Sequence, residues 1–193
     1  MNILPSRIFT LKTTAPLVQV KQQLAKHIDE PKLVRWNVSY NHAPYQGTIS
    51  DVGFEIRRII HYRNSFLPNI QGRFELLPVG TAVHIRMQLH PLILAFMAVW
   101  LGIWYSATVP MTFLGEISPL MKIGMLGIPL VACGVFLGAF HYEAERSQRD
   151  LTQIVTGQGL SQQPQRMPPV MRNLLWGYVA IAVAVFLHYV LTS

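Results

Sequence analysis

Three long runs of the chain contain no Asp, Glu, Lys or Arg. They cover residues 91–110, 123–141 and 174–191. At about 1.5 Å of rise per residue, about 18 to 20 helical residues cross the roughly 30 Å hydrocarbon core of a bilayer. Aromatic side chains collect near the ends of the runs, including Trp100, Trp104 and Tyr105 in the first, as is typical of membrane interfaces. The pattern predicts three transmembrane helices.

The distribution of basic residues predicts an orientation. Of the 16 Lys and Arg residues, eleven lie in residues 1–90, four lie in 142–173, and only Lys122 lies in 111–122. Because basic segments stay on the cytoplasmic side, we expect an N-terminus inside and a C-terminus outside. The first twelve residues also lack the apolar core of a secretory signal, which favours a cytoplasmic location for residues 1–90.

Small residues recur on one side of two predicted spans. Such strips let helix backbones approach closely. The strips predict helix packing inside one protomer or against a partner subunit, and both alternatives stay open. Their members are Gly127, Gly134, Gly138, Gly177, Ala180 and Ala184. Pro129, in the second span, predicts a kink.

Before the first span, apolar and polar residues mostly alternate. This period of two is typical of antiparallel strands with one buried face, and it predicts a meander of five or six strands. The alternating stretches are 9–11, 34–40, 54–60, 70–76 and 83–89. Clusters of Asn, Asp, Pro and Gly between several of these stretches indicate hairpin turns.

One segment of this region has a helical period. Thr14 is the predicted N-cap and Pro16 lies in the first turn. Leu17, Val20, Leu24 and Ile28 would share one face of a helix that ends before Pro31. A strand, a helix and then a strand meander is an α+β layout.

Residues 142–156 are again helix-like and continue from the second span, with Glu145 and Arg149 at the i,i+4 spacing of a helical ion pair. We expect this helix to return to the sheet, which makes the fold similar to helix-grip or pleckstrin-homology-like domains. The predicted organisation is a cytoplasmic α+β domain (1–90), a transmembrane hairpin (91–141), the returning helix (142–156), a linker (157–173) and a C-terminal span (174–193).

A set of motifs spread over residues 45–105 resembles a group of small bacterial membrane proteins, some from photosynthetic lineages. The motifs are Tyr45-x-Gly47, Phe54-x-Ile56-x-Arg58-x-Ile60, YRNSFLP at 62–68, Gly72, Gly80-Thr81 and His90-Pro91. The resemblance implies a bacterial origin and this architecture. It implies no activity and no site residues.

The sequence contains no motif that predicts catalysis or the binding of a cofactor. Cys133 is the single cysteine, so disulfides and multi-cysteine metal sites within the chain are excluded. His90 and His141 lie at one predicted membrane level and His188 at the other, and we interpret them as helix-end residues and not as haem ligands. We therefore expect no enzyme activity, no metal and no cofactor.

Carboxylates and arginines alternate along the predicted strands. We interpret Asp51, Glu55 and Glu75 as members of cross-strand pairs on a solvated face, where Arg57 and Arg73 alternate with them. A basic face of the sheet could contact anionic lipid headgroups or a partner protein. Its members would be Lys12, Arg35, Arg57, Arg73 and Arg86, and Arg63 in the turn at 63–65 could contact the same groups. Nucleic-acid binding is disfavoured because the aromatic residues belong to the predicted core.

The hypothesis that follows is a non-catalytic, multi-pass protein of the bacterial inner or thylakoid membrane. It would act as an accessory or assembly subunit of a larger complex, photosynthetic or respiratory, with membrane protein subunits as partners. The alternative is a membrane-anchored binding module whose α+β domain holds a lipid, a quinone or a pigment. An enzyme acting on a lipid ranks third.

Overall fold

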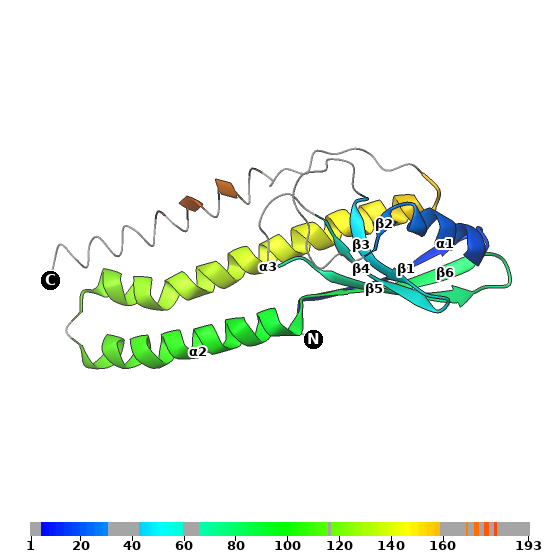
Figure 1. Cartoon of the computed structure of the whole chain (residues 1–193). Coiled ribbons are helices and arrows are strands. Elements are labelled where there is room, and N and C mark those ends of the chain that lie inside the picture. The colour runs from blue at the N-terminus through cyan, green and yellow to red at the C-terminus, as the bar shows by residue number, and fades with distance from the viewer. Residues whose placement is uncertain are drawn as a thin grey trace. The chain divides into compact units, whose positions relative to one another are not determined.

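The computed structural model describes residues 5–30, 43–59, 66–115 and 117–158, together with helical positions 169, 172, 173, 176, 177 and 180. The fold is α+β, as predicted. The elements in chain order are β1 (Ser6–Thr13), α1 (Leu17–Ala25), β2 (Ile28–Asp29), β3 (Tyr45–Ile49), β4 (Gly53–Arg58), β5 (Asn69–Leu76), β6 (Thr81–Gln88), α2 (Pro91–Leu114) and α3 (Pro119–Val155) (Figure 1).

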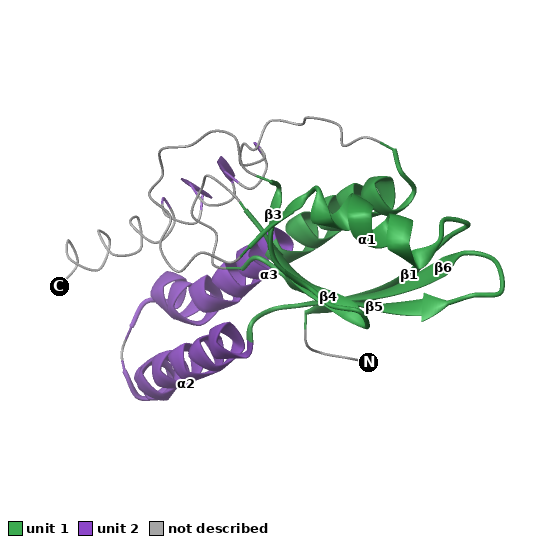
Figure 2. Cartoon of the chain, turned by 45° about the vertical axis from the view of Figure 1, so that its right-hand side comes forward, with its two compact units in different colours: residues 1–90, 140–166 green, residues 91–139, 167–193 purple. Residues whose placement is uncertain are grey.

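The chain divides into two compact units (Figure 2). Unit 1 combines residues 1–90 with 140–166, and unit 2 combines residues 91–139 with 167–193. The boundary between them therefore falls inside α3, whose first part belongs to unit 2 and whose last part belongs to unit 1.

The sheet of unit 1 has six strands in the order β1-β6-β5-β4-β3-β2. The prediction of an antiparallel sheet is wrong for one pair, because β2 runs parallel to β3, with Ile28 opposite Tyr45. Two parallel strands that follow each other in the chain need a connection of about a dozen or more residues. Residues 30–44 lie between β2 and β3. The predicted strand at 34–40 lies outside the described residues.

Alternation of burial confirms the period of two in the predicted strands. On β6, Val83, Ile85 and Met87 are buried while His84 and Arg86 are exposed. The same alternation on β4 buries Phe54, Ile56 and then Arg58, so a charged side chain occupies the last core-facing position. This position becomes important for the site described below.

Helix α1 differs from the prediction at both ends. The N-cap is Pro16, with no side-chain capping bond, and not Thr14, because the helix begins only at Leu17, three residues after Thr14. The helix ends at Ala25, and Ile28 belongs to β2 instead of the helix face. The predicted inner face is otherwise correct, since Val20 and Leu24 are buried.

The last part of α3 supplies the rest of the core of unit 1. Ala144, Leu151, Ile154 and Val155 are buried, at spacings that place them on one side of the helix. Figure 2 shows α1 and this part of α3 on the same side of the sheet. The sheet face that they cover is the one that carries Ile56, Ile70 and Ile85.

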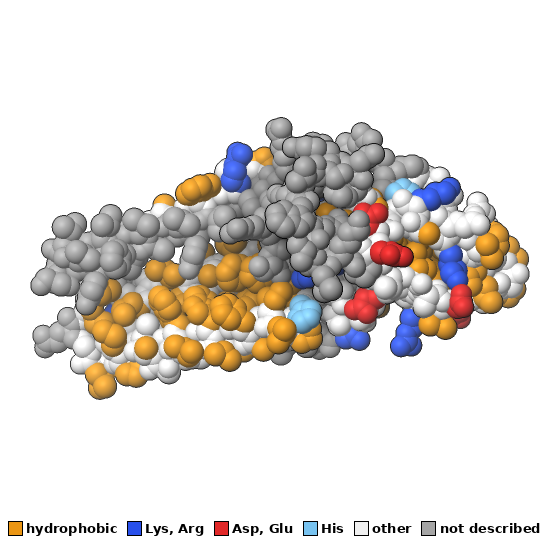
Figure 3. Space-filling model, in the orientation of Figure 1, with side chains coloured by type: hydrophobic (Ala, Val, Ile, Leu, Met, Phe, Trp, Pro, Cys, Tyr) orange, Lys and Arg blue, Asp and Glu red, His pale blue; other side chains and the backbone are white. Residues whose placement is uncertain are grey.

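Unit 2 contains α2 and the first part of α3, two helices long and apolar enough to span a membrane. In their most apolar 18-residue stretches only 6% and 22% of the residues are buried. Figure 3 shows hydrophobic side chains gathered over these helices. The predicted third span at 174–191 lies outside the described residues except for positions 176, 177 and 180, so three spans are not supported.

Side-chain hydrogen bonds join the two helices of the hairpin. The Trp104 indole donates to the Met125 carbonyl at 2.8 Å, and the Tyr105 hydroxyl donates to the Leu126 carbonyl at 2.9 Å. Pro129 lies inside α3 and has no N–H to give to the carbonyl four residues earlier, which is that of Met125. The Trp104 indole therefore replaces the donor that Pro129 removes.

Candidate functional site

A buried ion pair joins the sheet to α3 within unit 1. The Arg58 guanidinium at the end of β4 lies 2.9 Å from the Asp150 carboxylate, and the two side chains are only 5% and 17% exposed. Charged groups are expensive to bury unless they are paired, so each side chain requires the other. The pair joins the end of β4 to the last part of α3.

Tyr45, fully buried on β3, completes this cluster. Its hydroxyl donates to the same Asp150 oxygen at 3.4 Å, and the Arg58 guanidinium lies 6.0 Å from the centre of its ring. Burial, with the negative charge of Asp150 as the next cause, raises the pKa of the Tyr45 phenol well above its usual range. The cluster of Tyr45, Arg58 and Asp150 therefore keeps a neutral phenol as a donor to the carboxylate.

An open cleft runs along α3 on the side of β1. Its volume is about 480 Å³. Five of its lining residues follow the i, i+3, i+4, i+7, i+8 spacing of one helix face. These residues are Glu145, Gln148, Arg149, Thr152 and Gln153, with Arg7 of β1 and Gln158 at the sides.

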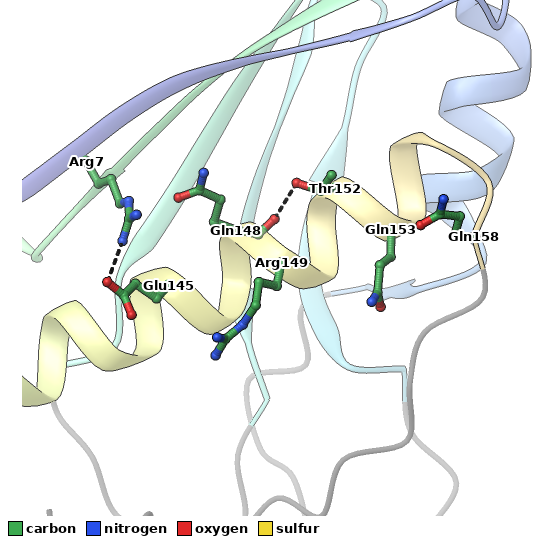
Figure 4. Close-up of a pocket in the computed structure, with 7 residues that line it drawn as sticks. All are labelled: Arg7, Glu145, Gln148, Arg149, Thr152, Gln153 and Gln158. Atoms are coloured by element: carbon green, nitrogen blue, oxygen red, sulfur yellow. Dashed lines mark hydrogen bonds and ion pairs between the residues drawn. The ribbon is translucent and has the colours of Figure 1, made fainter.

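Figure 4 shows how the cleft residues point. Arg7 reaches from β1 toward α3 and forms an ion pair with Glu145 at 3.4 Å. The predicted pair between Glu145 and Arg149 is therefore wrong, because the strand supplies the cation instead. Arg149 projects from the other flank of the helix face (Figure 4) and has no ion-pair partner among the described residues.

The outer face of the sheet holds the predicted arginines of the described strands. Arg57, Arg73 and Arg86 lie on neighbouring strands, in register with Asn69, His84 and Gln71 respectively. Arg73 and Arg86 are exposed and Arg57 is partly exposed. None of the three forms an ion pair with any residue that the structure describes.

The carboxylates of the strands have other partners than the predicted arginines. Glu55 accepts from Asn69 at 2.7 Å, and Glu75 lies 2.6 Å from His84. Asp51 pairs with Lys21 at 2.6 Å, and the hydrogen bond and the charge of that lysine lower the pKa of the Asp51 carboxyl. The prediction of cross-strand bonding holds for Glu55 and Glu75, with an asparagine and a histidine in place of the arginines. It is wrong for Asp51, which lies between β3 and β4 and pairs with Lys21 of α1.

Several predicted site residues have no described neighbour or lie outside the described residues. A Cβ atom added to any of four glycines would meet no atom within 4 Å; these are Gly127, Gly134, Gly138 and Gly177. Ala180 is an exposed helical position. Arg35, Arg63 and Ala184 lie outside the described residues.

Across the described part of the chain, no three His, Cys, Asp or Glu side chains group as metal ligands. His90 precedes α2, and the His141 ring packs edge-on against Phe140 with the ring centres 5.5 Å apart. His188 lies outside the described residues.

The sequence interpretation did not identify the buried cluster or the cleft. A signal for Arg58 was present, because it follows Phe54 and Ile56 at the spacing of core positions. Asp150 could be suspected only from its place on a helix expected to cover the sheet. Pairing between Arg7 and Glu145 needs the three-dimensional fold, since β1 and α3 stand at opposite ends of the chain order.

No protein-family model, curated protein or solved structure matches the chain.

Proposed function

We propose that the protein is a non-catalytic, membrane-embedded accessory or assembly subunit of a larger bacterial membrane complex. The observation that carries the membrane part is the exposed apolar surface of unit 2. On α2 the side chains of Leu92, Phe96, Val99 and Ile103 recur every three or four residues and are 61 to 73% exposed. A stripe of this kind requires an apolar environment.

The hydrogen bonds around Pro129 support the same conclusion. A carbonyl freed by a proline can bind water when the helix is solvated, but in hydrocarbon it needs a partner from the protein. The hairpin supplies that partner internally, through Trp104 to Met125. A third span at 174–191, the N-inside orientation, and an inner or thylakoid membrane remain part of the proposal.

The subunit role is supported by the surfaces that unit 1 and unit 2 leave open. The glycines Gly127, Gly134 and Gly138 have no described neighbour within 4 Å, so a helix of a partner could approach α3 there. The arginines Arg57, Arg73 and Arg86, with Arg63 as a sequence-based member, would contact anionic headgroups or an acidic partner surface.

The test is native mass spectrometry of the protein extracted from its own membrane in a mild detergent. We expect neighbours at fixed stoichiometry for the wild type. The combined variant Gly134→Ile and Gly138→Ile should lose them, while Gly102→Ile, on α2 and equally open, should keep them. A lone chain or a homo-oligomer in the wild type would contradict the subunit role.

The alternative of a lipid, quinone or pigment carrier predicts an enclosed apolar cavity in unit 1. The cleft along α3 is open to solvent, so it is not the enclosed cavity that this alternative needs. The carrier role stays a prediction from the sequence.

A further inference from the structure

β1 is an exposed edge of the sheet of unit 1. It pairs with β6 on one side, and no other described strand bonds to it. The opposite edge, β2, has two residues, whereas β1 has eight. Very short edge strands protect a sheet from pairing with other chains, and a long regular edge strand does not. The edge at β1 is therefore the side of the sheet that can accept another strand.

The hydrogen-bond ladder identifies the backbone groups that β1 leaves free. The Leu77 N–H donates to the Gly80 carbonyl between β5 and β6, so this pair and every second pair after it exchange backbone hydrogen bonds. Even-numbered residues of β6 therefore bond to β5, and its odd-numbered residues bond to the odd-numbered residues of β1. The N–H and C=O groups of the even-numbered residues of β1 point away from the sheet and bond to no residue that the structure describes. These residues are Ser6, Ile8, Thr10 and Lys12.

The middle of β1 lacks the features that usually protect an edge strand. It contains no proline, and its register with β6 runs without a bulge from Ser6 to Thr13. Its two charged residues, Arg7 and Lys12, lie near the ends, and the four residues between them are uncharged. Ile8, one of these four, is 66% exposed. An exposed β-branched side chain beside free backbone groups favours pairing with another strand.

The charges of β1 indicate what kind of strand would pair with it. β1 contains two cations and no carboxylate, so pairing with a second copy of β1 would bring four cations into one short ladder. Lys12 is exposed and forms no ion pair with any described residue. An acidic residue opposite Lys12 would supply a carboxylate, and opposite charges across a strand pair are stabilising. Charge therefore favours an acidic segment of another protein over a second copy of this chain.

There is also space beside β1 for such a segment. The cleft between β1 and α3 is open and has a volume of about 480 Å³. Figure 4 shows Arg7 pointing from β1 toward α3 at this cleft. Side chains of an added strand that share the face of Arg7 would lie next to the cleft and would not meet a packed core.

From these features we propose that β1 binds an extended, acidic segment of a partner protein as an additional antiparallel strand. The outward N–H and C=O groups of β1 would bond to the backbone of the segment, and an acidic side chain would lie opposite Lys12. Antiparallel pairing is favoured because it is slightly more stable per residue than parallel pairing. That the partner is a neighbour in a membrane complex rests on the proposed function, whereas the strand pairing does not.

The experiment is residue-resolved hydrogen exchange of the full chain. It is measured first in the complex isolated from its own membrane in a mild detergent, and again after a harsher detergent has removed the neighbours. We expect the amides of Ile8, Thr10 and Lys12 to exchange at least about tenfold more slowly in the complex. The amides of Phe9 and Leu11 already bond to β6 and should change less. This alternation distinguishes strand pairing from general burial of β1.

Two pairs of variants test the parts of the contact by native mass spectrometry. Thr10→Pro removes an outward N–H that the ladder to β6 does not use, so it should lower the amount of bound neighbour at least about fivefold. Thr10→Val keeps the N–H and should retain the neighbour. Lys12→Glu should release an acidic segment, whereas Lys26→Glu, the same charge change at the exposed C-cap of α1, should retain it. Circular dichroism verifies that each variant is folded.

Four results would overturn the proposal. Neighbours that are present while the β1 amides exchange as fast as in the isolated chain would contradict pairing at this edge and leave the subunit role intact. Equal losses in Thr10→Pro and Thr10→Val would show that the backbone of β1 is not the contact. Slow exchange of β1 in a homo-oligomer without neighbours would assign the edge to a second copy. A lone chain with fast exchange in β1 would contradict both the pairing and the subunit role.

Discussion

The Arg58 guanidinium of β4 lies 2.9 Å from the Asp150 carboxylate of α3, inside the core of unit 1. The hairpin of unit 2 separates these residues in the chain, and the ion pair brings their elements together. Because Tyr45 donates to the same carboxylate, three elements meet at one oxygen atom. Substitutions that remove the Asp150 carboxylate or one of its partners should therefore strongly lower the free energy of unfolding of unit 1.

Replacing Arg58 by Met should lower the free energy of unfolding by about 3 to 5 kcal/mol, because Asp150 would stay largely buried without its cation. Chemical unfolding in detergent, followed by circular dichroism, measures the change. The double variant Arg58→Met and Asp150→Leu should recover much of the loss, since no buried charge remains. The exposed Arg73→Met is the control, with an expected change within about 0.5 kcal/mol. Equal effects of Arg58→Met and Arg73→Met would contradict the assigned role.

Tyr45 should make unit 1 sensitive to alkaline pH. Its folded pKa is raised above the ordinary value of 10.0, so its contribution to stability is complete below about pH 10 and decreases as the pH rises beyond it. The slope from one proton is at most about 1.4 kcal/mol per pH unit. Unfolding titrations at pH 9 to 11, roughly, should show a steeper decline for the wild type than for Tyr45→Phe. Parallel slopes would show that the phenol ionises normally.

The bond from Trp104 to Met125 should couple energetically to Pro129. Trp104→Phe leaves the Met125 carbonyl without a donor, at a cost of about 1 to 3 kcal/mol. Pro129→Ala restores a backbone N–H for that carbonyl, so Trp104→Phe should cost less in the Pro129→Ala background. A double-mutant cycle on thermal stability in detergent measures the coupling energy between Trp104 and Pro129. It separates that energy from the packing that is lost when the indole ring is replaced by the smaller phenyl ring. Additive effects would mean that the indole is not replacing the missing N–H.

Gly72 should not tolerate a side chain. A Cβ atom at this position would overlap the Phe54 ring, which packs over Gly72 and against Phe74. Gly72→Ala should therefore cost about 1 to 3 kcal/mol by overpacking. Phe54→Leu in the same chain should relieve part of the strain. Gly102→Ala, which meets no atom within 4 Å, should be neutral or stabilise α2 by up to about 1 kcal/mol.

Periodicity was a good guide wherever burial alone decides the structure. The alternation at 83–89 corresponds to β6, because alternating apolar and polar residues bury one face of a strand. The apolar run at 91–110 corresponds to α2, because a run of this length and composition forms an apolar helix. The hairpin turn was predicted over 111–122, but α2 continues to Leu114 and α3 begins at Pro119. Helix ends depend on single capping bonds and are hard to read from a pattern.

Features that depend on long-range pairing could not be predicted from local patterns. The parallel pair of Ile28 with Tyr45 is set by the path of the chain after α1, and the partner of Glu145 is set by the position of β1. The cluster of Tyr45, Arg58 and Asp150 could not be predicted for the same reason. In the sequence Arg58 and Asp150 resemble surface charges, and they are buried only because α3 packs on the sheet.

The division of unit 1 on either side of the hairpin has a consequence for biosynthesis. Residues 1–90 emerge from the ribosome without Leu151, Ile154 and Val155, which fill their core, and without Asp150, which neutralises Arg58. The part of the sheet's apolar face that α3 covers must therefore stay exposed until residues 91–139 and the following turns of α3 have been translated. A ribosome-bound chain arrested before residue 140 should be open to protease in β4 to β6, and one arrested well beyond residue 166 should be protected.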